Sequence, residues 1–366
     1  MSNKKKYGQF YTTNCDYILK GIEIPVGTKL IEPFVGQGDL VRWSSRDEWE
    51  VYDIDPKCKA ETRDTLLNPP SYEGKFVITN PPFLARNKSK DKKIFDKYKV
   101  RDLYKASIKS FVEGGVDGGI LIIPFNFFCD TDSKIRSLFF ENYSISKVRV
   151  FEESVFDDTD VNVCSFKFEK KKFSGKIEFT FLPEDVSFTY ELKEEHGYKI
   201  AGEEFSNLES SEYRWGRLLK GQTPSTSLYL RAIDTGSEDG KIEMLVGSCE
   251  KRKSELEKKI LDEINTKYRG TIKDISIEID DYFYDTTEKS SERSFATITC
   301  NKKIEDEHLV AKMFNEELNS LREKYRSVFL TNFRNSTKSY ARKRISFDQA
   351  YILLDKIMHK LLDKEV

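Results

Sequence analysis

The chain has 366 residues, about two domains' worth at ~150 residues per domain. Hydrophobic residues make up 38% and aromatic residues 13% of it, which excludes a largely disordered protein. The 61 basic residues nearly cancel the 62 acidic ones and leave a formal net charge of -1. Because no overall positive charge draws the chain to nucleic acid, a nucleic-acid surface has to be a local patch.

Cysteine and histidine are too scattered to suggest a metal site. The six cysteines form no CxxC pair, and the three histidines are isolated from them, so we expect reduced thiols and no bound metal. The first residues are basic but no apolar stretch follows them, and the longest apolar run, 120–128, is interrupted by Pro124 and Asn126. We expect a soluble cytoplasmic protein without a membrane segment.

Short apolar runs alternate with polar, helix-like stretches from residue 29 to about residue 170, which predicts an α/β fold. The runs 76–79 and 119–123 are continuously apolar, as in strands buried on both faces of a mostly parallel sheet. A crossover helix is expected at 102–112, before the pair Gly114-Gly115.

The pattern changes after residue 170, where alternating strand-like segments and charged helix candidates begin. The last helix candidate starts with Ser346 and Gln349 in the positions of a capping box. We therefore expect two domains, residues 1–170 and residues 171–366.

Two apolar runs of the first domain are followed by residues that suit a nucleoside ligand. The run from Leu30 ends in Glu32, and a turn with Gly36 and Gly38 follows, where backbone can approach a ligand closely. This turn alone is a weak signal, because it lacks the third glycine of the dinucleotide fingerprint. The next run ends near Asp53, whose carboxylate can accept hydrogen bonds from ribose hydroxyls.

The most specific signal is Asn80-Pro81-Pro82-Phe83, directly after the run 76–79. The exocyclic amine of an aromatic base is a poor nucleophile, because its lone pair is delocalised into the ring. Two acceptors, the Asn80 side-chain oxygen and the Pro81 carbonyl, favour a pyramidal nitrogen with an available lone pair. The prolines fix the turn so that both acceptors converge, and Phe83 offers a stacking face. An ordinary strand-end turn is the alternative.

A similar string occurs at Asn68-Pro69-Pro70, but Ser71 takes the place of the aromatic residue. This string precedes the apolar run instead of following it. We interpret it as a loop.

Together these motifs resemble those of S-adenosylmethionine-dependent amino-methyltransferases of DNA, in particular the adenine-N6 class with an Asn-Pro-Pro-aromatic site. The motif order resembles the gamma type, with residues 8–13 (GQFYTT) as an N-terminal cofactor motif. The resemblance covers roughly residues 7–170. It implies a Rossmann-like class I methyltransferase domain, with a mostly parallel seven-stranded sheet, in residues 1–170. Residues 171–366 match an α+β target-recognition and DNA-binding domain only by position and length.

The implied activity is methyl transfer from S-adenosylmethionine to the N6 amino group of an adenine flipped out of double-stranded DNA. The enzyme would serve a restriction-modification system or mark DNA alone, and a cognate restriction endonuclease would act as a separate protein. The cofactor-binding residues that the resemblance implies are Tyr11 and Thr12 beside the methionine moiety, Glu32 at its ammonium, Phe34, Gly36 and Gly38 in the glycine loop, Asp53 at the ribose, and Ile54 and Asp64 at the adenine.

The resemblance makes Asn80, Pro81, Pro82 and Phe83 the catalytic turn, with Phe83 stacking on the target base. It also suggests a second aromatic residue at the base, for which we choose Phe168 over Phe166. A role for Phe168 in the hydrophobic core is at least as well supported by the sequence.

Extrusion of a base requires the DNA to be held around the site. The candidate phosphate contacts lie in three basic segments, 84–99, 215–231 and 331–344, although such segments are commonly just solvated surface. Their selected residues are Arg86, Lys88, Lys92 and Lys93 in the first, Arg217 and Lys220 in the second, and Arg334, Lys338, Arg342, Lys343 and Arg344 in the third.

Other enzymes share the Asn-Pro-Pro signature, so methylation of an RNA adenine or of a protein glutamine is the main alternative. A non-catalytic module with a methyltransferase fold would require the loss of an essential element, and none is missing from the sequence. A dehydrogenase would explain the glycine turn and Asp53 but not residues 80–83. Cytosine-amino enzymes more often carry serine at position 80, so adenine is preferred.

Overall fold

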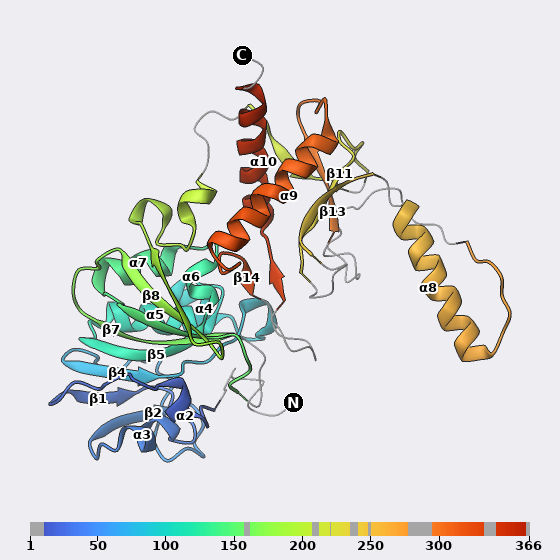
Figure 1. The fold of residues 1–366 in the computed structure, drawn as a ribbon. Helices are drawn as coiled ribbons and strands as arrows, with labels where there is room; N and C mark the ends of the chain where they lie inside the picture. Colours follow the sequence, from blue (N-terminus) through green and yellow to red (C-terminus); the bar gives the residue numbers. More distant parts are fainter. Residues whose placement is uncertain are drawn as a thin grey trace. The chain divides into compact units, whose positions relative to one another are not determined.

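The computed structural model describes residues 11–156, 162–206, 212–219, 221–234, 241–247, 250–276, 295–332 and 342–363 (Figure 1). The chain forms two compact units, Met1–Glu204 with Val328–Arg342 and Phe205–Ser327 with Lys343–Val366. The first unit carries both the glycine loop and the Asn-Pro-Pro turn.

A mostly parallel sheet is the centre of the first unit, as expected for an α/β fold. Among the described residues it has nine strands, two more than expected, in the order β3-β2-β1-β4-β5-β7-β6-β8-β9. All neighbouring strands are parallel except that β7 is antiparallel to β5 and β6, and β9 to β8. The strands are β1 (Lys29–Glu32), β2 (Trp49–Asp53), β3 (Glu61–Thr62), β4 (Lys75–Thr79), β5 (Gly118–Pro124), β6 (Lys147–Phe151), β7 (Val163–Glu169), β8 (Lys176–Leu182) and β9 (Val186–Glu191).

The central strands are apolar because both of their faces are covered. Every residue of β5 is buried, and so are four of the five residues of β4. The two strands pack so closely that a Cβ added at Gly119 would lie 2.4 Å from the Val77 carbonyl oxygen. Glycine at the start of β5 is therefore a packing requirement.

Short helices connect these strands, and the expected crossover helix is confirmed as α5 (Leu103–Glu113). The Asp102 side chain caps it by accepting from the Tyr104 N–H, and Gly114 ends it. Among the described residues of the whole chain, no helix has both the length and the apolar character needed to cross a membrane. The remaining elements of this unit are α2 (Cys15–Ile18), α3 (Asp39–Ser44), η1 (Arg86–Lys88), α4 (Lys93–Tyr98), α6 (Asn126–Cys129), α7 (Lys134–Asn142), η2 (Glu194–His196), η3 (Gly202–Phe205, whose last residue belongs to the other unit) and β14 (Thr331–Asn332).

The strand order reverses between β1 and β4. From β1 the chain continues outward to β2 and β3, then crosses back to β4 on the other side of β1. At such a switch point the loops that leave the carboxyl ends of the strands separate and open a crevice for ligands. Three polar side chains end up there, Glu32 and Asp53 at the ends of β1 and β2, and Asn80 just after β4.

Strands β8 and β9 extend the sheet past the domain boundary expected at residue 170, so that the first compact unit continues to Glu204. Strand β8 pairs in parallel with β6 along the whole length of β6, from Glu178 to Leu182. Its Phe179 is fully buried, with its ring 5.1 Å from Phe128 and 6.3 Å from Phe125. The aromatic core of the unit therefore depends on residues on both sides of the expected boundary.

The second unit is of the α+β type. As far as the structure describes this unit, its antiparallel sheet has four strands in the order β10-β13-β11-β12, and α9 packs against both β12 and α10. The capping box of Ser346 and Gln349 is confirmed at the start of α10. The elements are β10 (Trp215–Arg217), β11 (Leu228–Arg231), β12 (Glu243–Val246), α8 (Glu250–Tyr268), β13 (Phe295–Cys300), α9 (Glu307–Lys324), β15 (Lys343–Arg344) and α10 (Phe347–Leu362).

Two phenylalanines that face each other across β8 and β9 test whether β8 is an integral part of the core. Phe179→Ala should destabilise the protein by about 3–5 kcal/mol, because it empties a fully buried aromatic site. Its partner in the register is Phe188, which is 37% exposed. Phe188→Ala should lower the free energy of unfolding by clearly less than Phe179→Ala does, as measured by urea denaturation followed by circular dichroism. Equal losses would contradict the burial described here.

Candidate functional site

The glycine loop after β1 is held by the next strand and by the N-terminal segment. The Gly36 N–H donates to Asp53 Oδ2 at 2.9 Å. Gly36 has a φ of +52°, and a Cβ at this position would lie 2.9 Å from Cε1 of the Tyr11 ring. Only glycine meets both conditions without strain, so the sequence of the loop fixes its close approach to Tyr11.

Glu32 ends β1 and is only 1% exposed. Its Oε1 accepts from the Phe34 N–H at 3.0 Å and from the Thr79 hydroxyl at 2.5 Å. Burial raises the pKa of Glu32 from 4.5 to about 8; the two hydrogen bonds lower it, and the nearby Asp53 carboxylate raises it further. The site thus holds a buried carboxyl group that a cation would stabilise in its charged form.

Asp53 ends β2 and is 3% exposed. One carboxylate oxygen accepts from Gly36, and the other accepts from the Asp55 N–H at 2.8 Å. The Cys58 thiol is also hydrogen-bonded to this carboxylate. Since a carboxylate oxygen can accept more than one hydrogen bond, these contacts are compatible with a ligand hydroxyl. The next residue, Ile54, is 38% exposed and presents an apolar surface to the same cavity.

The Asn-Pro-Pro turn follows β4 directly. The Asn80 Nδ2 donates to the Thr12 hydroxyl at 3.0 Å, which anchors the donor end of the amide and fixes the direction of its oxygen. Pro82 lines the cavity, whereas Phe83 is 8% exposed and its ring meets that of Tyr104 edge-on, at 6.4 Å between centroids.

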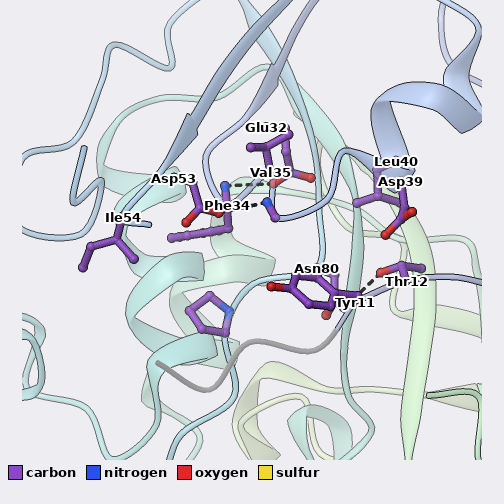
Figure 2. A pocket seen from close by; sticks show the side chains of 12 residues that line it. Tyr11, Thr12, Glu32, Phe34, Val35, Asp39, Leu40, Asp53, Ile54 and Asn80 are labelled. Atoms are coloured by element: carbon purple, nitrogen blue, oxygen red, sulfur yellow. Dashed lines mark hydrogen bonds between the residues drawn. The ribbon is translucent and has the colours of Figure 1, made fainter. Parts of the chain in front are cut away.

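These groups surround one cavity, with about 580 Å³ of empty space when the part open to solvent is included. Figure 2 shows Glu32 and Asp53 on one side of it, with Asn80, Tyr11 and Thr12 close to one another on another side. The lining residues are Tyr11, Thr12, Glu32, Phe34, Val35, Gly36, Asp39, Leu40, Asp53, Ile54, Asn80 and Pro82. Gly38, Asp64, Pro81 and Phe83 were also expected in the site, but they do not line the cavity.

Sequence reasoning missed four residues of the site: Val35, Asp39 and Leu40, which line the cavity, and Thr79, which holds Glu32. The first three lie within or next to the glycine loop, so their position in the chain was the available signal. Thr79 is the one hydroxyl in the apolar run of β4, an irregularity that could have drawn attention.

Asp64, expected at the cofactor adenine, stabilises its own turn. Its Oδ1 accepts from the N–H groups of Leu66 and Leu67, at 3.1 and 3.0 Å. The neighbouring Thr65 hydroxyl donates to the Pro33 carbonyl at 3.1 Å, which ties this turn to the glycine loop. Asn68, the first residue of the second Asn-Pro-Pro string, is exposed and lies outside the cavity lining.

Phe168, expected at the target base, lies in the hydrophobic core. It is 1% exposed, and its ring is 5.3 Å from Phe139 and 5.0 Å from Tyr143. It pairs with Gly119 at the amino end of β5, away from the carboxyl ends where Asn80 lies. The structure therefore does not bring Phe168 to the cavity.

The basic segment 84–99 divides into structural and solvent-facing cations. Arg86 pairs with Asp96 at 2.6 Å, and the Lys92 ammonium donates to the carbonyls of Arg86 and Ser89. Four further lysines of the segment are exposed: Lys88, Lys90, Lys93 and Lys99.

The candidate contacts in the C-terminal half are partly embedded. The Arg217 guanidinium lies 4.6 Å from the Phe347 ring centroid. Burial and the nearby Arg217 lower the pKa of Arg344, and the Lys343 ammonium lies 3.5 Å from the Arg326 carbonyl. Arg342 is half-buried. The remaining candidates, Lys220, Arg334 and Lys338, and the N-terminal motif residues 8–10 lie outside the described residues.

No family model and no curated protein matches the chain. Solved structures that resemble it include a modification subunit from Vibrio vulnificus whose description links it to a type I restriction enzyme (12% identity, 49% of this chain and 48% of that chain, TM-score 0.40). Two others are a chain of a type I restriction-modification system (16%, 54% and 49%, 0.40) and the methyltransferase subunit of such a system from Streptococcus thermophilus (16%, 48% and 48%, 0.37).

This chain spans about half the length of each of those chains. At these identities and TM-scores the likenesses carry no conclusion about its activity.

Proposed function

We propose that the chain is an S-adenosylmethionine-dependent DNA methyltransferase that modifies the N6 amino group of an extruded adenine. The observation that carries this proposal is the meeting of Glu32, Asp53 and Asn80 at one cavity, from three neighbouring strands at the switch point of the sheet. This reaction requires a carboxylate for the cofactor's ammonium, a carboxylate for its ribose and an amide for the target amine. Glu32, Asp53 and Asn80 would supply these three groups in that order.

The residues present fit the cofactor. The buried Glu32 carboxyl, whose pKa burial raises to about 8, would receive the cofactor's ammonium, because a cation offsets the cost of its charge. Asp53 would accept the ribose hydroxyls, and Ile54 and Phe34 offer apolar surface for the adenine ring. When bound, S-adenosylmethionine supplies a methyl group made electrophilic by its positive sulfonium.

The catalytic turn would act on the incoming amine. Thr12 holds the amide nitrogen of Asn80, so the Asn80 oxygen has a fixed direction. Together with the carbonyl of Pro81, a residue that does not line the cavity before a base is bound, this oxygen would accept both amine hydrogens of the target adenine and localise the nitrogen lone pair. No general base is needed beforehand, because the amine can lose its proton after the transfer. Preorganised acceptors of this kind act mainly on the transition state.

A duplex adenine cannot reach a cavity inside the protein, so the base has to be extruded. Phe83 directly follows the turn and would stack on the extruded ring. In this structure it is 8% exposed against Tyr104, so we expect stacking to accompany a local rearrangement of Phe83. The exposed lysines of segment 84–99 follow Phe83 in the chain, which supports a role in holding the phosphate backbone.

Replacing Glu32 tests how the ionisation of its buried carboxyl group affects the stability of the protein. In the folded protein its carboxyl stays protonated up to about pH 8, whereas in the unfolded chain it ionises near pH 4.5, so its contribution to stability falls as pH rises between these values. Glu32→Gln keeps a side-chain acceptor but carries no charge. Its Tm should exceed that of the wild type at about pH 9 and match it at about pH 5. A Tm difference independent of pH would contradict the buried ionisation.

Replacing Asn80 tests the catalytic turn. Asn80→Ala should lower kcat for methyl transfer to DNA by about 100-fold or more while cofactor binding persists, because the lost contact forms at the transition state. The matched control is Asn68→Ala, which alters the exposed second Asn-Pro-Pro string and should leave kcat nearly unchanged. Both are measured with a radiolabelled methyl donor. If Asn80→Ala were active while a folded Asn68→Ala were inactive, the assignment of the chemistry to the turn at Asn80 would be wrong.

The phosphate role of segment 84–99 is tested by changing Lys88, Lys90 and Lys93 together to Gln. Each phosphate contact truly made should account for ~0.9 of the slope of log affinity against log salt concentration. A control variant changes Lys147, Lys172 and Lys176, which are exposed near the amino ends of β6 and β8, at the opposite edge of the sheet. The first variant should flatten the slope and the second should not. Equal slopes for the wild type and both variants would show that segment 84–99 is ordinary solvated surface and does not contact phosphates.

A further inference from the structure

The hydroxyl of Thr79 is the one polar side-chain group of β4 beyond Lys75, and it is fully buried. Burying a hydroxyl without a hydrogen-bond partner costs free energy. Here the hydroxyl donates to Glu32 Oε1 at 2.5 Å, across the boundary between β4 and β1. The residue directly after Thr79 is Asn80. One buried side chain thus connects the strand that carries the catalytic turn with the carboxyl group of the cofactor cavity.

The direction of this hydrogen bond matters for the charge of Glu32. An ionised carboxylate is only an acceptor, so its two donors, Thr79 and the Phe34 N–H, favour the charged form. Burial and the Asp53 carboxylate at the end of β2 favour the neutral form. Burial outweighs the two donors and raises the pKa of Glu32 to about 8, so removal of one donor should raise this pKa further.

We propose that Thr79 is a positioning residue for Glu32: its hydroxyl favours the charged form of the carboxylate and orients it to receive the ammonium of an amino-acid-bearing nucleoside. This inference rests on the proposed function and narrows it, because Thr79 acts on one end of the ligand only. The ribose and adenine contacts, at Asp53 and Ile54, do not involve the Thr79 hydroxyl.

Two other titratable groups among the described residues act electrostatically with Glu32. Asp53 lies on β2, and Tyr72 lies in the segment before β4. Burial raises the pKa of Tyr72 far above its usual range, so its hydroxyl stays neutral in ordinary assay buffers. Lys75, at the far end of β4, pairs with Glu50 at 2.5 Å. The change of affinity with pH between about 6 and 7.5 should therefore follow Glu32, below the range in which a ligand α-amino group begins to lose its proton.

The test compares two ligands that differ at the amino-acid end. S-adenosylhomocysteine carries the ammonium, and 5′-methylthioadenosine has the same nucleoside without the amino acid. Thr79→Val replaces the hydroxyl by a methyl group of similar size, and Thr79→Ser restores the donor. Binding of both ligands to the full chain is measured by calorimetry at several pH values between about 6 and 7.5, so the readout does not depend on catalysis.

We expect Thr79→Val to bind S-adenosylhomocysteine about 10- to 100-fold more weakly, the range for a hydrogen bond to a charged group. The pH dependence of this affinity should be shifted to higher pH than in the wild type, because Glu32 of the variant ionises at higher pH. Binding of 5′-methylthioadenosine should stay unchanged, which also shows that the variant is folded, and Thr79→Ser should restore most of the lost affinity.

Equal weakening for both ligands would overturn the positioning role and leave Thr79 as a packing residue only. Unchanged binding of S-adenosylhomocysteine by Thr79→Val would overturn it as well, although the wild-type protein would still bind the cofactor as proposed. If the wild-type protein bound neither ligand, the proposed function would fall and the role of Thr79 with it.

Discussion

A buried carboxyl group at the reversal of the sheet is the constraint on which the site depends. Glu32 is almost completely enclosed, and two hydrogen bonds offset only part of the cost of its charge. If no ligand ever bound to this group, an apolar residue at position 32 would make the protein more stable than the buried acid does. Keeping an acid at this position lowers the stability of the unliganded protein, and a bound ammonium would reverse that effect. A loss of stability of this kind is common at binding sites, which agrees with the proposed function.

The rest of the cavity is assembled around that group by contacts between distant parts of the chain. The Tyr11 ring covers Gly36, and Thr12 holds Asn80. The segment that follows these residues is also held by β7, because the Ser165 hydroxyl on that strand donates to the Ile18 carbonyl at 2.6 Å. The groups proposed for the cofactor and those proposed for the target base thus share the same supports. A change in the N-terminal segment should affect both binding and chemistry.

Much of this arrangement is visible in the sequence because buried parallel strands are continuously apolar and each functional group follows one. The positions of Glu32, Asp53 and Asn80 could be predicted in this way. The aromatic residue Phe168 could not be placed, because an apolar strand residue reads the same whether it faces a ligand or a core, and only the register with β5 decides. The extension of the sheet by β8 was missed because its alternating pattern also suits a separate domain. The roles of Arg86 and Lys92 were hidden because a charge does not reveal which carbonyl or carboxylate it meets.

The most direct test of the central claim is to map methylated adenine in DNA from cells that express the chain or its Asn80→Ala variant. The account predicts N6-methyladenine at one recurring sequence context in DNA from cells with the wild-type chain, and none above background with the variant. Radiolabelled methyl groups that appear in RNA or protein, with no N6-methyladenine in DNA, would contradict it. Equal N6-methyladenine with both chains would contradict the assigned role of Asn80.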